Sequence, residues 1–194
     1  VYSTPLAGSL SGTITLDGQG DPEAYFIFKF DGAFTVGVGT EIILTGGTRA
    51  ANVFWISEGA ISIGANSQLE GTLISHPGAL SLGLNCTLEG RLLSSEGAIT
   101  IGAGSTVIMP QGDSTIPIKC SGNCGPTAAV DVLGSLKQYA LFTGSGAVAN
   151  AATSGIVGDI GTNLGAISGF GTSTHVGFFN FPGASTAQAA VDLD

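Results

Sequence analysis

A nineteen-residue repeat, present three times between residues 59 and 108, restricts the fold of this chain more than any other feature. The copies read GAISIGANSQLEGTLISHP, GALSLGLNCTLEGRLLSSE and GAITIGAGSTVI. Each begins with a glycine, at Gly59, Gly78 and Gly97, and a second glycine follows five residues later. Repetition at so short a period is typical of a solenoid, in which each copy forms one coil.

Apolar residues alternate within each copy, and this period of two predicts short strands with one buried face. One unit cannot bury its own apolar row, but stacked units form ladders about 4.8 Å apart. We therefore predict a mainly β, parallel β-solenoid with about nineteen residues per turn and little helix. The leucine-rich repeat, an alternative of overlapping period, lacks support because its Asn ladder is absent. The residues expected inside are Ile61, Ile63, Leu80, Leu82, Ile99 and Ile101.

Small side chains occupy the positions between these core residues and should point outward. They form a column of alanines beside a column of serines and threonines, and all are uncharged. Such a face would be flat, and it would suit an ordered water lattice, a crystalline polysaccharide or another copy of the protein. The alternative is an ordinary solvated face whose small residues serve close packing. The candidate binding residues are Ala33, Thr35, Ala60, Ser62, Ala79, Ser81, Ala98 and Thr100.

The next outward columns are less regular. Gln68, Thr87 and Thr106 form one, and Glu70 and Glu89 form the other. Like charges on adjacent coils repel mildly. We expect these columns to lie on a solvated face.

The composition excludes several classes of function. The net charge is −9 with five basic residues, so a nucleic-acid partner or an anionic membrane surface is not expected. No apolar run approaches the length of a membrane-spanning helix. No catalytic motif accompanies His76 and His175, so we predict no enzyme, metal or cofactor. Asp17 and Asp21 suit either a calcium loop or turn capping, and capping is the simpler interpretation.

The cysteines are three in number. Cys120 and Cys124 lie in KCSGNCG, where either a small disulfide or two free thiols is possible. Cys86 occupies the repeat position held by Ser67 and Ser105 in the sister copies, so we interpret it as a small turn residue.

Several segments in their order along the chain resemble the ice-binding protein family: TLDGQGDPEAYFIFKF, NVFWISEGAISIGA, GTLISHPGALSLG and GRLLSSEGAITIG. The resemblance implies a discontinuous, roughly triangular, right-handed β-solenoid with a long helix along one side. Residues 133–170 resemble the region that normally opens such a domain, and residues 184–194 resemble the first turns of its helix.

The order of these parts is inverted relative to the family. We therefore predict a C-terminal-type half-solenoid at residues 1–110 and a Pro/Gly/Ser/Cys linker at 111–130. An N-terminal-type half, of the same or the next domain, follows at 131–194. A window from a tandem array, a circular permutant and a subunit completed by its neighbour all fit this order.

The family's loose ice-binding motif is Thr-Ala/Gly-x-Thr/Asn, and this chain departs from it. The corresponding strings begin with Ile63, Leu82 and Ile101 instead of Thr. That departure predicts weak ice binding. Our prediction from the sequence is a non-enzymatic structural or adhesive module of a large extracellular surface protein or filament.

The expected location is secreted or on the cell surface. The expected partners are neighbouring copies bound head to tail, and ice or another flat surface. No nucleic acid and no membrane insertion are expected. An ice-binding domain that uses the flat Ala/Ser/Thr face is the alternative function.

Overall fold

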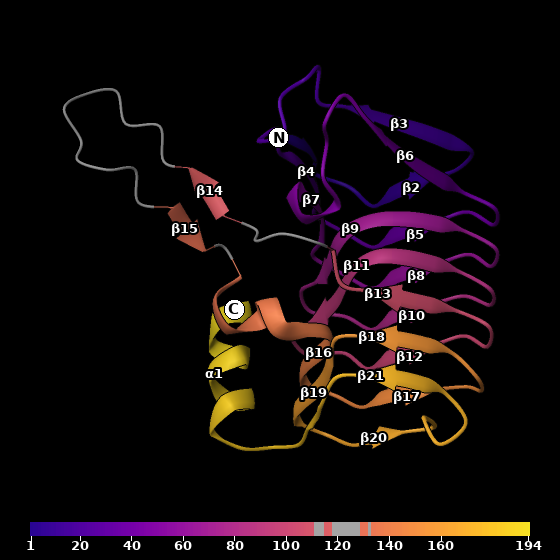
Figure 1. Cartoon of the computed structure of the whole chain (residues 1–194), viewed down its shortest axis with the longest axis vertical. Helices are drawn as coiled ribbons and strands as arrows, with labels where there is room; N and C mark the ends of the chain where they lie inside the picture. The colour runs from indigo at the N-terminus through magenta and orange to yellow at the C-terminus, as the bar shows by residue number, and fades with distance from the viewer. Residues whose placement is uncertain (111–114, 118–128, 132) are drawn as a thin grey trace.

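The computed structural model describes residues 1–110, 115–117, 129–131 and 133–194. These residues form a parallel β-solenoid with one short helix at its side, as Figure 1 shows. Cys120 and Cys124 lie outside the described residues, so their pairing stays a prediction.

One side of the solenoid is a seven-stranded sheet in which every neighbouring pair is parallel. In its centre Ile61 pairs with Leu80 and Leu80 with Ile99, so one coil step equals the nineteen-residue repeat. In order, the strands are β2 (Gly8–Leu10), β5 (Phe34–Val36), β8 (Ile61–Ile63), β10 (Leu80–Leu82), β12 (Ile99–Ile101), β17 (Val148–Asn150) and β20 (Ile167–Ser168).

A thirteen-stranded sheet forms the other two sides. The second side contains β3 (Thr13–Asp17), β6 (Glu41–Thr45), the first parts of β9 (Gln68–Ser75) and β11 (Thr87–Ser94), β13 (Thr106–Ile108), β18 (Gly155–Val157) and β21 (Thr174–Val176). The third side contains β1 (Tyr2–Thr4), β4 (Phe26–Phe30), β7 (Val53–Ser57), the later parts of β9 and β11, β16 (Tyr139–Ser145), β19 (Asp159–Leu164) and β22 (Phe179–Asn180).

The core lies inside the coils, as the alternation predicted. All six core residues named from the repeat are at most 4% exposed. Aromatic rings fill the wider coils near the N-terminus, where Trp55 stacks on Phe28 with ring centroids 4.2 Å apart. The prediction of the inward row is therefore confirmed.

The glycine that starts each copy is required by the close approach of the coils. A Cβ atom on Gly97 would lie 2.0 Å from the carbonyl oxygen of Gly78. A second corner uses the left-handed backbone, with φ of 59° at Asn66, 53° at Asn85 and 73° at Gly104. The regular placement of Gly and Asn in the repeat thus reflects tight turns between stacked coils.

Hydroxyl groups bind the coils together at this same corner. The hydroxyl of Ser67 donates to the carbonyl oxygens of Gly37 and Gly64, and Ser105 donates to that of Gly83. Cys86 occupies the intervening rung, fully buried, with its Sγ 3.2 Å from the carbonyl oxygen of Gly64. Cys86 is therefore a small turn residue, as expected.

The chain after residue 132 returns to the same sheets. Val148 of β17 pairs with Ile99 of β12, and β16 pairs with β11. Thus strands from both sides of the predicted linker share both large sheets, although the bounds at 110 and 130 remain a prediction. Two further strands, β14 (Thr115–Pro117) and β15 (Ala129–Asp131), pair with each other in antiparallel orientation.

Helical segments cover the third side. α1 (Ala184–Leu193) packs over β16 and β19 and against the 3₁₀ helix η2 (Gly134–Gln138), and η1 (Ala50–Asn52) precedes β7. Ala189 of α1 is fully buried in an apolar cluster with Leu136 and Phe142. Asp192 fixes the end of the helix by accepting hydrogen bonds from the amide and hydroxyl of Ser135 at 2.7 and 2.6 Å. The seven-stranded side carries no such cover among the described residues.

Candidate surface-binding site

The outer face of the seven-stranded sheet carries an unbroken column of alanines. The residue directly after each alanine donates its amide to the carbonyl oxygen of the alanine on the next coil. Phe34, which follows Ala33, donates to Ala60 at 3.0 Å, and Ile61 donates to Ala79 at 3.0 Å. The column includes every alanine predicted for it. Its members are Ala7, Ala33, Ala60, Ala79, Ala98, Ala147 and Ala166.

A second column lies two residues further along each strand. The strand register aligns Ser62 with Thr35 and with Ser81. All members are hydroxyl residues except one alanine, and none is fully buried. The column comprises Ser9, Thr35, Ser62, Ser81, Thr100, Ala149 and Ser168.

The two columns together make a regular grid. Neighbouring coils are about 4.8 Å apart, and residues two apart on a strand are separated by about 6.7 Å. The pairing across this sheet proceeds without a register shift. The face therefore presents methyl and hydroxyl groups at fixed intervals and no charged side chain within either column.

The repeat predicted four rungs of this grid, those of Ala33, Ala60, Ala79 and Ala98. It did not predict the rungs that begin at Ala7, Ala147 and Ala166. The strings GAVAN from Gly146 and GAISG from Gly165 repeat the Gly-Ala-apolar pattern and would have identified two of them. The coil at Ala7 has no such signal, because Leu6 replaces the leading glycine.

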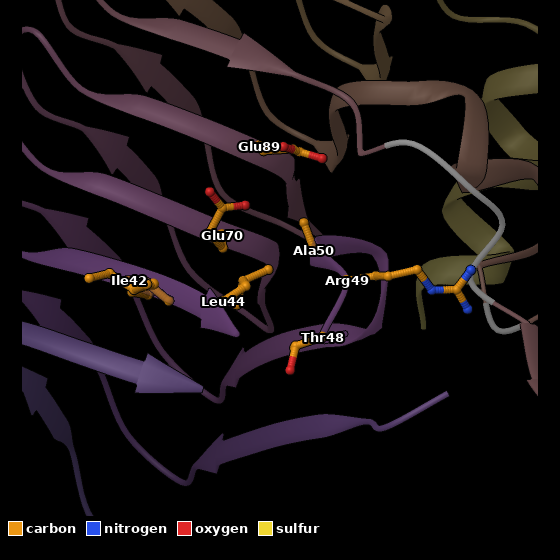
Figure 2. A pocket seen from close by; sticks show the side chains of 8 residues that line it. Ile42, Leu44, Thr48, Arg49, Ala50, Glu70 and Glu89 are labelled. Carbon is orange, nitrogen blue, oxygen red and sulfur yellow. The ribbon is translucent and has the colours of Figure 1, made fainter. Parts of the chain in front are cut away.

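The second side of the solenoid differs because two carboxylates stand in its centre. Glu70 and Glu89 pair in register on β9 and β11, and Figure 2 shows their carboxylates side by side. They line a hollow of about 530 Å³ with Ile42, Leu44 and Ala50 among its other residues. The carboxylates do not face one another across this hollow, so the arrangement does not fit acid–base cleavage of a glycoside.

The expectation that both carboxylates are solvated is correct for Glu89 only. Glu89 is exposed, whereas Glu70 is half-buried beneath the loop that follows β6. Burial, and then the neighbouring charge of Glu89, raises the pKa of Glu70 to about 7. The repeat alone does not predict this difference, because Thr48, Arg49 and Ala50, which line the hollow with Glu70, belong to an insertion in the repeat.

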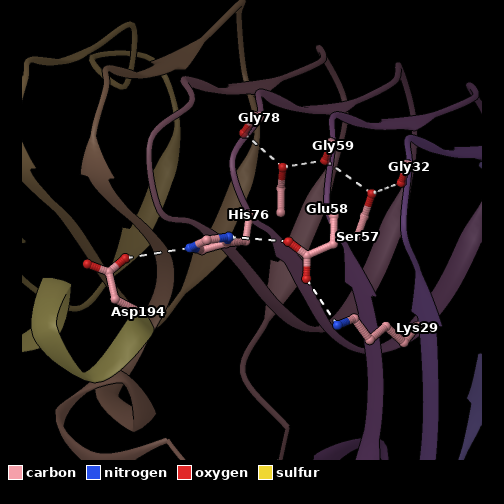
Figure 3. Close-up of polar contacts among 9 residues, drawn as sticks. Lys29, Gly32, Ser57, Glu58, Gly59, His76, Gly78 and Asp194 are labelled. Carbon is pink, nitrogen blue, oxygen red and sulfur yellow. Dashed lines mark hydrogen bonds and ion pairs between the residues drawn. The ribbon is translucent and has the colours of Figure 1, made fainter. Parts of the chain in front are cut away.

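His76 takes part in a surface network of charges (Figure 3). Its Nδ1 lies 3.4 Å from Glu58 Oε2, and Lys29 Nζ lies 3.2 Å from the other oxygen of Glu58. On its far side, His76 Nε2 lies 3.9 Å from Asp194 Oδ1. The Lys29 ammonium, followed by His76, lowers the pKa of Glu58. Glu58 and His76 are half-exposed and Asp194, directly after α1, is exposed, so the network lies at the surface between the end of the helix and the coils.

The remaining candidates for chemistry are satisfied by backbone contacts. Asp17 accepts a hydrogen bond from the amide of Gln19 at 2.8 Å, and Asp21 accepts one from Glu23 at 2.9 Å, as turn caps do. His175 lies 3.0 Å from the carbonyl oxygen of Gly158. Across the described ranges, His, Cys, Asp and Glu residues do not gather in threes as a metal would require. In that same part of the chain, no helix has the length and apolarity to span a membrane.

The fold and this face define a class: β-solenoids with one uncovered, flat side of small residues and another side covered by a helix. Comparison with known proteins then identifies the family. The chain belongs to the ice-binding-like family, whose model matches residues 1–107.

Individual relatives agree with this assignment. Ice-binding protein 1 of Shewanella frigidimarina is 40% identical over 77 residues, which are 39% of this chain and 9% of that protein. An ice-binding protein of Nostoc is 33% identical over 75 residues, which are 39% of this chain and 28% of that protein. The chain thus spans well under half of each of these relatives.

A solved structure shows the same fold. The crystal structure of an ice-binding protein from an Antarctic bacterium of the Flavobacteriaceae matches with a TM-score of 0.52 and 37% sequence identity. The match covers 98% of this chain and 45% of that chain.

Proposed function

We propose that this chain is an ice-binding domain and that the face of the seven-stranded sheet is its ice-binding surface. The observation that carries the proposal is the pair of columns of small side chains that run through seven coils. The names of the relatives and of the matched crystal structure support ice as the ligand.

The chemistry of the face suits a flat, repeating solid. Each contact with ordered water is weak, so affinity has to come from many contacts made at once. A rigid grid of methyl and hydroxyl groups supplies them without first ordering long side chains, whose immobilisation would cost entropy. Charged groups bind liquid water strongly, and the two columns contain none.

The departure from the Thr-Ala/Gly-x-Thr/Asn motif does not weaken this proposal. Ile63, Leu82 and Ile101, which replace its leading threonine, are at most 4% exposed. They belong to the core and do not alter the outer surface. Glu70 and Glu89, whose charges would oppose docking on ice, lie on the second side of the solenoid and not on this face.

Growth of single ice crystals in the presence of the protein tests the proposal. We expect faceted crystals and a measurable gap between the melting and freezing temperatures. Ser81→Lys places a long charged chain in the centre of the grid and should abolish most of that gap. Thr87→Lys is the matched control, because Thr87 is exposed one corner later in the same coil on the second side.

Two outcomes would contradict the ice-binding proposal. One is round, unfaceted growth with the unaltered chain. The other is an equal loss of activity in Ser81→Lys and Thr87→Lys while both remain folded.

A domain of this kind needs no catalytic group, and we propose that it is not an enzyme. Ice that a protein can bind as a surface forms outside the cell, which supports a secreted or cell-surface location. The second candidate function is a structural or adhesive module of an extracellular filament. A separate feature favours it: the two ends of the solenoid.

A further inference from the structure

Each end of the solenoid presents three strand edges, one from each side. β1, β2 and β3 form one end, and β20, β21 and β22 form the other, at the top and bottom of Figure 1. Among the described residues, no strand pairs with the outer edge of any of these six. Exposed edges are templates for further strands, and proteins usually cover or block them.

The backbone groups at the two ends are complementary. Gly8 donates to Ala33 at 2.9 Å and Leu10 accepts from Gly37 at 2.8 Å, so both bond toward β5. Because alternate residues of a parallel strand bond to opposite neighbours, the amide and carbonyl of Ser9 face the open edge. At the other end, Val148 donates to Ala166 at 2.8 Å, so the amide and carbonyl of Ile167 face outward. Inside the sheet, equivalent groups bond to each other.

Apolar side chains are exposed at both ends. A hollow of about 260 Å³ at the β20 end is lined by Ile167, Phe170, Phe179 and Phe181. Phe181 is 60% exposed there, and Tyr2 at the opposite end is 63% exposed. Gathered apolar surface of this kind marks an interaction site.

We propose that the two ends bind each other, head to tail, between copies of this chain. A single peptide strand can pair with one edge only. A second solenoid offers three parallel edges in the same triangular arrangement, so all three can pair together. Stacking would also continue both columns of the flat face, with Ala166 followed by Ala7 and Ser168 by Ser9. This contact is heterologous and does not close, so it builds a filament.

This inference rests on the second candidate function and not on ice binding. Ser81, which tests ice binding, lies in the middle of the sheet, and its replacement leaves both ends unchanged. The two proposals can therefore fail separately.

Sedimentation velocity of the full chain, at concentrations rising to the millimolar range, measures the association. We expect a series of species from monomer upward. Ser9→Pro removes an amide that the fold does not use, and proline is tolerated on an edge strand. It should yield monomers, whereas the control Ser9→Thr, which keeps the amide, should associate like the parent.

The opposite end is blocked by Ile167→Pro. Because this change touches a partly buried residue, Gly171→Arg provides a second variant. Gly171 lines the hollow at the β20 end, and no atom lies within 4 Å of a Cβ built on it, so the new side chain would project there without disturbing the fold. Each blocked variant retains one free end. A mixture of Ser9→Pro with either variant should therefore form a 1:1 dimer that stops growing.

Three outcomes would overturn the proposal. The first is an unaltered chain that stays monomeric throughout the concentration range. The second is a folded Ser9→Pro variant that associates as well as Ser9→Thr. A dimer formed by either blocked variant alone would show a contact between like ends instead.

Discussion

The first side of the solenoid, which is the seven-stranded sheet, and the second side share one backbone plan but differ in their outward residues. On the first side, every rung of both columns is Ala, Ser or Thr. On the second, the column through Glu70 and Glu89 also contains Ile43, Ile108 and Val157. The inward residues of both sides are equally apolar and buried, from Ile61 on the first to Leu69 and Leu88 on the second.

This difference separates folding from binding. Inward positions are restricted by the core alone, so they resemble one another on every side. Outward positions on the second side vary because the fold does not require any one residue type there. Uniformity on the first side is therefore not a by-product of the coil, and it is this uniformity that supports binding to a repeating surface.

The largest expected effect comes from placing a carboxylate at an inward position, compared with placing one at a neighbouring outward position. Leu82→Asp buries an unpaired carboxylate where the side chain is 3% exposed, and it should cost on the order of 4 kcal/mol or more. Ser81→Asp introduces the same residue one position earlier, where the side chain faces outward. It should change the free energy of unfolding by about 0.5 kcal/mol or less. Thermal unfolding followed by circular dichroism compares them. If Leu82→Asp melts with the parent, the assignment of inward and outward residues is wrong.

A smaller effect is expected at the corner between the third side and the seven-stranded side, where each copy of the repeat begins. Gly97→Ala would bring Cβ to 2.0 Å from the Gly78 carbonyl oxygen, so neighbouring coils must separate, at a cost of about 1–3 kcal/mol. Gly171→Ala is the control, because its Cβ would enter open space. Denaturant unfolding of both variants measures the difference. Equal stability would show that the coils adjust without strain and that the repeated glycines have another origin.

Much of the fold could be predicted from the sequence because its signals are local. Alternation and a fixed period place Ile61, Leu80 and Ile99 inside without any knowledge of distant contacts. The corners at Asn66 and Asn85 follow from the residues that tolerate positive φ.

Other features depend on contacts between distant segments. The pairing of Val148 with Ile99 spans the region around the predicted linker, and no local pattern specifies that this strand should extend the earlier sheet. The candidate face was recognised in its centre for the same reason that the fold was, because its rungs repeat at nineteen residues. Ala7 lies 26 residues before Ala33 and Ala147 lies 49 residues after Ala98, so neither follows the nineteen-residue period. Ala166 does follow Ala147 at nineteen residues, but this pair is separated from the three consecutive copies and was not predicted from them.

The surroundings of Glu70 likewise include a segment that the repeat does not predict. Glu70 lies in a hollow whose lining includes Thr48, Arg49 and Ala50, and these three residues belong to an insertion that interrupts the repeat between β6 and β7. From the sequence, Glu70 and Glu89 are equivalent. In the structure only Glu70 is half-buried, and this difference produces the smallest of the predicted effects.

The pKa of Glu70, raised from 4.5 to about 7, predicts that stability falls as pH rises between those values. In this window the folded chain binds a proton that the unfolded chain has released, so the free energy of unfolding decreases with pH. Partial exposure screens the carboxylate, and we expect a loss of about 1–2 kcal/mol. The carboxylates whose pKa values are lowered, Glu58 and Asp192, act below this window and with the opposite slope.

Two variants isolate this effect in denaturant unfolding measured from pH 5 to pH 8. Glu70→Gln should remove the decline. Glu89→Gln removes only the second cause of the raised pKa, the neighbouring charge, and should make the decline shallower without abolishing it. Burial, the larger cause, would remain, because the replacement leaves Glu70 in the same hollow. A decline that persists unchanged in Glu70→Gln would show that another group titrates in this range and that the half-buried position of Glu70 is not its cause.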